Sequence, residues 1–288
     1  MPELPEVETL RRELVPAVRG KTVKAVKVKW PKIVKPSSPA SFSARLRGKK
    51  IISIKRRAKV LILELSSGDY LAVHLKMTGQ LIYKRKSGKI IAGGHPQEGG
   101  LDNLPNKYTH IIIEFTDKSV LYFNDLRKFG WMRVVNNKEL EKIDNNFGIE
   151  ALDTKFNFKR FKEILNRYPN RKIKQVLMDQ KLIAGIGNIY ADEACFCAGI
   201  LPTRIVKDIS DVEIKKLLSC IKKILKLAIS KGGTSYNTYV QLSGKPGGFV
   251  PYLKVYGRKG EKCKKCGGII ERIKVGGRGT QFCRSCQK

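Results

Sequence analysis

The sequence predicts an α+β fold in which a leading helix precedes an antiparallel β-sandwich, a helical region and a C-terminal hairpin. Three observations support this order. Apolar residues recur at helical spacing directly after Met1, short β-rich runs separated by turn residues extend to about residue 135, and helical periodicity dominates beyond that point. We expect four segments: an N-terminal sandwich domain (1–135), a linker (136–150), a helical domain (151–252) and a cysteine-bearing segment (253–288).

The leading helix is predicted from an apolar stripe, with Pro5 suited to its start and Gly20 to its end. The stripe consists of Leu4, Val7, Leu10, Leu14 and Val18. The strands that follow are separated by turn-rich stretches, notably Pro31–Ser43 and Lys86–Lys107. The predicted strands are Val26–Val28, Lys50–Lys55, Val60–Leu65, Tyr70–Leu75, His110–Phe115, Val120–Phe123 and Trp131–Val135.

The longest predicted helix starts near Asp208, where Ser210 and Glu213 have the spacing of a capping box. Gly232 and Gly233 end it. An earlier helix is predicted around the apolar face of Phe158, Phe161, Ile164 and Tyr168. Residues 232–252 are rich in Gly, Ser, Thr and Tyr, so we expect a mobile loop there.

The charge of the chain favours a polyanionic partner. Lys and Arg number 58 against 25 Asp and Glu, which gives a formal net charge of +33. Each phosphate that a basic protein neutralises releases counterions, so such an excess favours nucleic acid. A membrane surface is the main competitor, but no apolar run approaches the ~20 residues that span a bilayer, and the first residues are acidic. We expect a cytoplasmic, monomeric protein that does not enter membranes and loses only its initiator methionine.

Cysteines at the C-terminus predict a metal site. Cys263-x-x-Cys266 and Cys283-x-x-Cys286 have the spacing of a four-cysteine zinc site, and the glycine-rich segment between them can form a hairpin. Because four thiolates fill the coordination sphere, we expect one structural Zn²⁺ and no catalytic metal. Basic residues around the pairs indicate a finger that faces phosphates. The other three cysteines, Cys195, Cys197 and Cys220, are interpreted as buried or unreactive thiols.

The amino terminus offers a candidate nucleophile. Pro2 is small enough for removal of Met1, which would leave a secondary amine at the chain terminus beside Glu3. An α-amino group titrates near ~8, so part of it is neutral at pH 7 and able to form a Schiff base. Taken alone, the run Pro2–Glu6 is interpreted as only a capped helix start.

That run nevertheless closely resembles the opening of the formamidopyrimidine-DNA glycosylases, and the resemblance extends to the last residues. Five further stretches match the family pattern in order, followed by the cysteine pairs: Arg56–Lys59, His74–Gly79, Asp125–Gly130, Gly185–Glu193 and Val255–Gly260. The resemblance implies a β-sandwich, a helical domain with a helix-two-turn-helix motif, and DNA bound in the cleft between them.

The resemblance also implies catalytic roles. Pro2 would be the nucleophile and Glu3 the general acid that assists departure of the base and opening of the sugar. Lys59 matches the family lysine that serves β-elimination, and Arg278 matches the arginine of the δ-elimination step. Without the motif, Lys59 would be interpreted as a solvated charge in a strand.

Further positions match residues that bind DNA in the family. Met77, Arg127 and Phe129 match the three side chains that fill the space left by an extruded base, with Arg127 facing the partner base. By pattern alone, Met77 and Phe129 would be core residues of the sandwich. Asn188 suits a phosphate contact at a helix N-terminus, and Lys174 is a second expected phosphate contact. The remaining expected DNA contacts are His74 and Tyr108.

Three positions depart from the family pattern. Lys76 stands where glycine is usual, Leu126 replaces the commoner proline, and Tyr108 stands where a histidine is often found. These departures bear on the geometry of the site and not on the reaction.

The sequence therefore predicts a bifunctional DNA glycosylase and apurinic-site lyase that removes oxidised purines, such as 8-oxoguanine and formamidopyrimidines, from duplex DNA. Leu4 with the Arg127 and Phe129 pair favours purines over the oxidised pyrimidines that related enzymes prefer. A non-enzymatic zinc-finger protein that binds DNA or RNA by charge fits the composition and cysteines equally well, but leaves the Pro2–Glu3 terminus unexplained.

Overall fold

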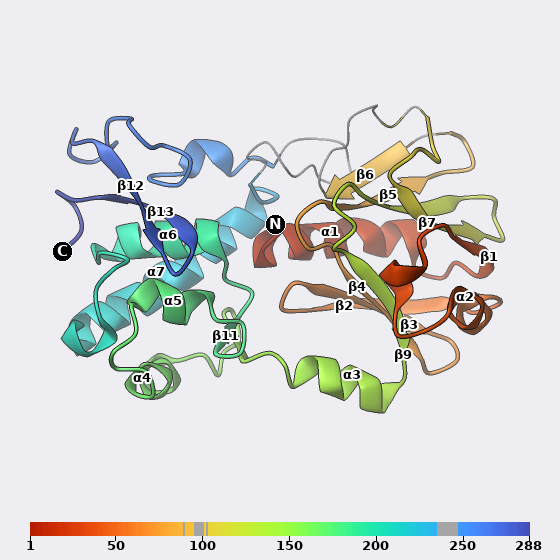
Figure 1. The fold of residues 1–288 in the computed structure, drawn as a ribbon, viewed down its shortest axis with the longest axis horizontal. Coiled ribbons are helices and arrows are strands. Elements are labelled where there is room, and N and C mark those ends of the chain that lie inside the picture. The colour runs from red at the N-terminus through yellow and green to blue at the C-terminus, as the bar shows by residue number, and fades with distance from the viewer. Residues whose placement is uncertain (89, 95–100, 102, 235–246) are drawn as a thin grey trace. The chain divides into compact units, whose positions relative to one another are not determined.

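The computed structural model describes residues 1–88, 90–94, 101, 103–234 and 247–288. The chain divides into two units, which we call the sheet unit (Met1–Asp144 and Gly232–Gly248) and the helix unit (Asn145–Lys231 and Phe249–Lys288). Figure 1 shows the elements of both. Most of the loop predicted over 232–252 lies outside the described residues.

The sheet unit is a sandwich of two antiparallel sheets. One sheet has the strand order β1-β7-β8-β5-β6 and the other β2-β3-β4-β9. Its strands are β1 (Val23–Val28), β2 (Ile51–Arg57), β3 (Val60–Leu65), β4 (Tyr70–His74), β5 (Gly79–Lys84), β6 (Ile90–Gly94), β7 (Thr109–Phe115), β8 (Val120–Asp125) and β9 (Trp131–Val135). Its helices are α1 (Leu4–Val18), the 3-10 helix η1 (Pro31–Val34), α2 (Pro39–Leu46) and α3 (Asn137–Asp144).

Helix α1 belongs to the core of the sandwich. Leu10 and Leu14 are completely buried and share one cluster with apolar residues of both sheets, such as Leu61 and Phe123. In Figure 1, α1 runs between the two sheets. Burial of this stripe fixes the start of the chain against the sheets, because exposing each large apolar side chain would cost about 1.5–3 kcal/mol.

Five elements of the sheet unit were not predicted, namely η1, α2, α3, β5 and β6, and α2 and β5 show why. Helix α2 lies in the stretch predicted as turns, where Ser38 accepts a hydrogen bond from the Ser41 N–H and Pro39 occupies the first turn. It buries Phe42 and Leu46. Strand β5 is buried on both faces, so its sequence lacks the alternation that marks a half-exposed strand.

The helix unit packs short helices around α6 and α7. Its α-helices are α4 (Phe158–Asn166), α5 (Ile173–Met178), α6 (Asn188–Ala198) and α7 (Asp211–Ser230). The predicted capping box of α7 is present, since the Ser210 hydroxyl accepts from the Glu213 N–H and the Glu213 carboxylate accepts from the Ser210 N–H. The remaining elements are β10 (Ile149–Glu150), β11 (Ile183–Ala184), η2 (Val206–Asp208), η3 (Val250–Tyr252), β12 (Ile270–Val275) and β13 (Arg278–Cys283). No helix in the described part of the chain is long and apolar enough to cross a bilayer.

The interpretation of the three additional cysteines as thiols is wrong for two of them. Cys197 near the end of α6 and Cys220 in α7 form a disulfide, with their Cα atoms 5.8 Å apart. Cys195 remains a buried thiol, and burial raises its pKa. The sequence did not reveal the disulfide because the pairing depends on how the two helices pack, and not on a local spacing.

Reducing this disulfide should destabilise the helix unit. The cross-link removes conformational freedom from the unfolded chain, and for a loop of this length the stabilisation is about 3 kcal/mol. We expect that loss in chemical unfolding followed by circular dichroism after treatment with a phosphine reductant that leaves zinc bound. The Cys197→Ala/Cys220→Ala protein should show the same loss and no response to reductant. Alkylation of both cysteines in the untreated protein would contradict the cross-link.

Candidate functional site

The start of the chain is held by a buried carboxylate. Pro2, Glu3 and Glu6 are buried, whereas Met1 is 43% exposed. The Glu6 carboxylate accepts the Glu3 N–H at 2.9 Å, and its other oxygen accepts the Thr234 N–H at 2.8 Å and the Thr234 hydroxyl at 3.0 Å. Glu6 therefore fixes the backbone beside Pro2 and ties it to the residue that precedes the segment 235–246.

Lys59 is neither in a strand nor solvated. It lies in the two-residue turn between β2 and β3, where Ala58 adopts a left-handed backbone with φ of 52°, and it is only 3% exposed. Val60, the next residue, pairs with His74 across β3 and β4. A lysine buried at this position is held in one place, unlike a surface lysine.

His74 is a neutral, buried imidazole. Burial, followed by the charges of Lys76 and Lys59, lowers its pKa to about 3. Its Nδ1 accepts the Lys76 N–H at 2.9 Å, so the remaining proton is on Nε2. The ring also contacts the ring of Trp131. His74 therefore offers one fixed N–H donor over the whole physiological pH range.

Lys76 has a left-handed backbone, with φ of 51°. Glycine adopts this conformation without a steric cost, and lysine does not. This explains in physical terms why glycine suits the position.

A second buried carboxylate shapes the loop after β8. Asp125 is completely buried, and it accepts hydrogen bonds from the Thr78 hydroxyl, the Arg127 N–H at 3.2 Å and the Gly130 N–H at 2.6 Å. The Thr78 hydroxyl oxygen also accepts the Arg127 N–H at 3.0 Å. A Cβ on Gly130 would lie 2.7 Å from the Phe123 ring, so the loop passes too close to the sheet for another residue.

The side chains of residues 126–129 on this loop are exposed, whereas Met77 lies in a separate turn. Phe129 is 55% exposed, Met77 is half-buried in the turn after β4, and the Arg127 guanidinium lies over the Phe129 ring with Cζ 4.7 Å from its centre. Neither Met77 nor Phe129 belongs to the sandwich core. Leu126 is exposed beside them, at 48%.

Tyr108 lies next to the same loop. Its carbonyl accepts the Asp125 N–H at 3.0 Å, and its half-buried ring lies under the Lys107 ammonium. His110 is within hydrogen-bonding distance of the Asp125 carbonyl, 2.8 Å from Nε2. The sheet unit therefore brings Tyr108, Arg127 and Phe129 together around Asp125.

In the helix unit, Asn188 begins α6 and contacts the hairpin of β12 and β13. Its side-chain amide donates to the Gly279 carbonyl at 3.0 Å, while its Oδ1 is buried and has no hydrogen-bond partner among the described residues. The N–H groups of the first turn of α6 have no partners within the helix, as at every helix start. Asn188 therefore orients the hairpin against a helix N-terminus.

Lys174 does not fit the expected phosphate contact, because its side chain is 1% exposed. Its ammonium lies 2.7 Å from the Asp192 carboxylate and donates to the Thr280 hydroxyl at 2.8 Å and the Gly279 carbonyl at 3.3 Å. A lysine held in this way positions the hairpin.

Two acids of α6 were not assigned roles from the sequence. Asp192 accepts the Gln281 N–H at 2.9 Å, and burial raises its pKa to about 7 although Lys174 opposes the shift. The Glu193 carboxylate accepts the N–H groups of Lys254, Val255 and Tyr256 at 2.8–3.0 Å. Both hold segments of the C-terminal region against α6. The sequence feature that could have identified Asp192 and Glu193 is a pair of adjacent acids in an otherwise apolar helix.

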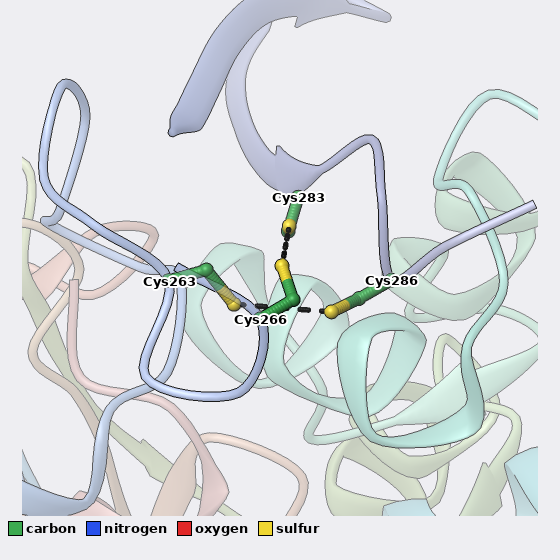
Figure 2. Close-up of side chains that lie close together, drawn as sticks. All are labelled: Cys263, Cys266, Cys283 and Cys286. Atoms are coloured by element: carbon green, nitrogen blue, oxygen red, sulfur yellow. Dashed lines mark hydrogen bonds between the residues drawn. The ribbon is translucent and has the colours of Figure 1, made fainter. Parts of the chain in front are cut away.

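The four cysteines form a zinc site, as predicted. Figure 2 shows their side chains converging from two knuckles, and their sulfur atoms lie within 4.8 Å of one another. The Sγ atoms of Cys263 and Cys286 are 3.9 Å apart and those of Cys266 and Cys283 are 3.5 Å apart. A tetrahedral ion with Zn–S bonds of about 2.3 Å requires sulfur separations of about 3.8 Å, so these thiolates fit one structural zinc.

Arg278 is exposed at the tip of the hairpin that ends in this zinc site. Gly276 and Gly277 form its two-residue turn, both with positive φ, and Val275 pairs with Arg278. This turn geometry favours glycine at both positions. The neighbouring Gly279 carbonyl receives the hydrogen bonds from Asn188 and Lys174, so the three predicted residues of this unit lie together.

Comparison with known proteins agrees with this geometry. Residues 1–132 match the formamidopyrimidine-DNA glycosylase N-terminal domain, residues 147–240 match the formamidopyrimidine-DNA glycosylase H2TH domain, and residues 260–288 match the zinc finger found in FPG and IleRS. These matches define a zinc-finger protein of the H2TH class.

Individual relatives are similar over almost the whole chain. The formamidopyrimidine-DNA glycosylase of Carboxydothermus hydrogenoformans is 42% identical over 92% of each chain, and that of Bacillus licheniformis is 42% identical over 92%. A solved Lactococcus lactis FPG mutant in complex with Fapy-dG containing DNA is 35% identical over all of both chains, with a TM-score of 0.88. The chain belongs to the formamidopyrimidine-DNA glycosylase family.

The His74 environment gives a test by NMR. Lys76→Gly should raise the pKa of His74, because it removes a nearby positive charge, but the pKa should stay well below 6.5 because burial is the larger cause. Titration of the ring protons, followed by NMR, measures the pKa of His74 in wild type and in Lys76→Gly. Lys128→Gly is the matched control: Lys128 also has positive φ, and its charge lowers the pKa of His110 instead. A wild-type His74 that titrates near 6.5 would contradict the neutral, buried ring.

Proposed function

We propose that this protein is a bifunctional DNA glycosylase and apurinic-site lyase that removes oxidised purines from duplex DNA. The observation that carries the proposal is the terminus, where Pro2 and Glu3 are buried and Glu6 fixes their backbone. A terminus held in this way suits a reacting group better than a simple helix start, which needs no link to Thr234. Membership of the formamidopyrimidine-DNA glycosylase family supports the same function.

The proposed reaction begins when removal of Met1 gives Pro2 a terminal secondary amine. Its nitrogen attacks C1′ of the damaged nucleotide, and the base leaves with the electrons of the glycosidic bond and takes up a proton. Glu3 is proposed as the acid that assists this step and the opening of the sugar that follows. In the ring opening the C1′–O4′ bond breaks, O4′ takes up a proton, and the nitrogen lone pair forms the Schiff base between Pro2 and C1′. The buried Glu6 does not need to react, because its oxygens accept N–H groups that position the terminus.

Strand cleavage then follows by two eliminations. Loss of a proton from C2′ of the Schiff base expels the 3′ phosphate, and loss of a proton from C4′ expels the 5′ phosphate. We assign Lys59 to the first step and Arg278 to the second. The burial of Lys59 supports its assignment, because a lysine in a fixed position can transfer a proton at one site.

Extrusion of the damaged base requires side chains that fill the gap in the stack. We assign this role to Met77, Arg127 and Phe129, since all three project from turns of the sheet unit that Asp125 and Thr78 hold in place. Tyr108 is proposed to contact DNA beside them.

Phosphates are proposed to bind at two places. In the sheet unit, His74 can donate one hydrogen bond through Nε2, and its lack of charge at neutral pH means that this contact does not change with pH. In the helix unit, Asn188 and the N-terminus of α6 provide donors. With a net charge of +33, binding should weaken steeply with salt. We propose that the protein acts as a monomer in the cytoplasm, on chromosomal DNA.

Oxidised pyrimidines are the second candidate substrate. Solved relatives include MutM in complex with carbocyclic 8-oxo-G containing DNA, 35% identical with a TM-score of 0.87, and Lactococcus lactis FPG in complex with an oxidised pyrimidine containing DNA, also 35% identical. The family thus accommodates both classes, and we place purines first because of the Arg127 and Phe129 pair.

The DNA adduct should form on Pro2. An exposed lysine is almost wholly protonated at pH 7, whereas a terminal amine is close to its titration point. Borohydride reduction of the protein with a duplex carrying 8-oxoguanine, followed by proteolysis and mass spectrometry, should place the DNA on the N-terminal peptide. A variant that retains Met1 should give no adduct. Lys59→Ala should still be trapped, but more slowly, and an adduct on the Lys59 peptide would assign the nucleophile elsewhere.

Arg127 should govern recognition of the base opposite the lesion, because a guanidinium in the vacated stack can donate to that base's edge. Arg127→Ala should reduce the preference between opposing C and A by about tenfold or more, while lyase activity on a preformed apurinic site remains. Nicking rates on the two duplexes measure this. The control is Lys128→Gly, which removes a neighbouring charge from the same loop. Equal selectivity in Arg127→Ala and wild type would rule out this role.

A further inference from the structure

Helix α7 carries a run of lysines that no step of the proposed reaction uses. After Glu213 the helix contains no acidic residue. We call its five lysines the lysine face: Lys215, Lys216, Lys222, Lys223 and Lys226. Four of them are exposed and Lys222 is half-buried. The other exposed residue between Lys215 and Lys226 is Ser219, so the surface of this segment is cationic and hydrophilic.

The lysine face points away from the interior of the helix unit. The opposite stripe of α7 contains Ile214, Leu217, Ile221 and Leu225, all buried. Through its buried side, α7 packs on α6, to which Cys220 is also bonded. Helix α6 in turn packs on β13, where Asp192 accepts the Gln281 N–H. Helix α6 therefore lies between α7 and β13 (Figure 1), and the lysine face is on the side of α7 opposite its buried stripe.

The charge of this face is not compensated. Other cations of the unit have carboxylate partners: Lys162 lies 2.6 Å from Asp211, and Arg171 lies 3.1 Å from Asp179. Among the residues that the structure describes, none of the five lysines forms such an ion pair. Lys222 donates to the Asp153 carbonyl at 3.5 Å and lies over the Phe156 ring.

Lysines in this arrangement repel one another. Lys222 and Lys226 are neighbours at a spacing of four residues, and Lys223 and Lys226 at a spacing of three, where like charges destabilise a helix. Such a cluster is stabilised by a partner that supplies regularly spaced negative charges. At 1.5 Å per residue the face is about 16 Å long, enough to follow several phosphates of one DNA strand.

We propose that the lysine face binds the backbone of a second segment of duplex DNA while the lesion site holds the first. The choice of DNA as the partner rests on the proposed function, which places the enzyme among duplex segments. A membrane surface is disfavoured because the exposed residues of this segment include no aromatic or aliphatic side chain to insert between lipids.

The experiment uses full-length, zinc-loaded protein saturated with a duplex that carries an abasic-site analogue. A fluorescein-labelled, undamaged 20-base-pair duplex is then added, and its binding is followed by fluorescence anisotropy at several salt concentrations. Wild type should bind it. Lys215→Gln/Lys223→Gln/Lys226→Gln should bind it at least tenfold more weakly, with a salt slope reduced by up to about 3, because each phosphate contact contributes about 0.9. Glutamine preserves helix propensity, and circular dichroism verifies the fold.

The matched control is Lys24→Gln/Lys27→Gln/Lys50→Gln, which removes the same charge from exposed positions of the sheet unit. It should keep wild-type binding of the second duplex. An equal loss of affinity for the second duplex in both triple variants would mean that only net charge matters, and it would overturn the proposal. The proposal would also fail if wild type saturated with the lesion duplex bound no second duplex. Loss of binding to anionic vesicles, with unchanged duplex binding, would identify a membrane partner instead.

Nicking of a duplex that carries 8-oxoguanine, measured in parallel, separates this proposal from the proposed function. The lysine-face variant should nick at the wild-type rate under single-turnover conditions. If no form of the protein nicks the duplex, the proposed function fails, and the anisotropy result still decides the role of the lysine face.

Discussion

Buried carboxylates that accept backbone N–H groups hold three segments of this protein that carry or adjoin candidate functional residues. Glu6 fixes the N-terminus, Asp125 the loop of Arg127, and Glu193 the segment before the finger. A buried carboxylate is costly unless its oxygens are hydrogen-bonded, so each chain segment must adopt the one conformation that satisfies it. The conformation of these loops is thereby set by buried side chains, and exposed residues on them, such as Phe129, are held in fixed positions.

The same principle explains how the helix unit joins the hairpin to the start of α6. Lys174 and Asp192 form an ion pair inside the unit, and their remaining hydrogen bonds go to β13. Removal of one partner would leave the other charge buried and unpaired, which is strongly destabilising. The hairpin, the start of α6 and the zinc knuckles are thus joined into one structural unit. Zinc fixes the cysteine end of the hairpin, and the Lys174–Asp192 ion pair fixes the end near its turn.

The sequence allowed prediction of elements whose signal is local. The stripe and Pro5 of α1, the capping box of α7 and the two cysteine pairs all depend on residues close in the chain, and the structure confirms them. Features set by tertiary packing were missed or misplaced: α2, the two-sided burial of β5, the Cys197–Cys220 disulfide and the burial of Lys174. The motifs located the candidate residues. Only the fold distinguishes the side chains that reach solvent from the buried side chains that hold other residues in position.

The two-residue turn of the hairpin limits how this region can vary. Side chains alternate across β12 and β13, and Arg278 is the first residue after the turn. One inserted residue would shift the register and transfer Arg278 to the opposite face, while Thr280 would lose its place beside Lys174. Natural variation here should therefore consist of substitutions between the cysteine pairs, with the length from the turn to Cys283 held constant. The number of residues between Arg278 and Cys283 then sets how far the arginine lies from the metal.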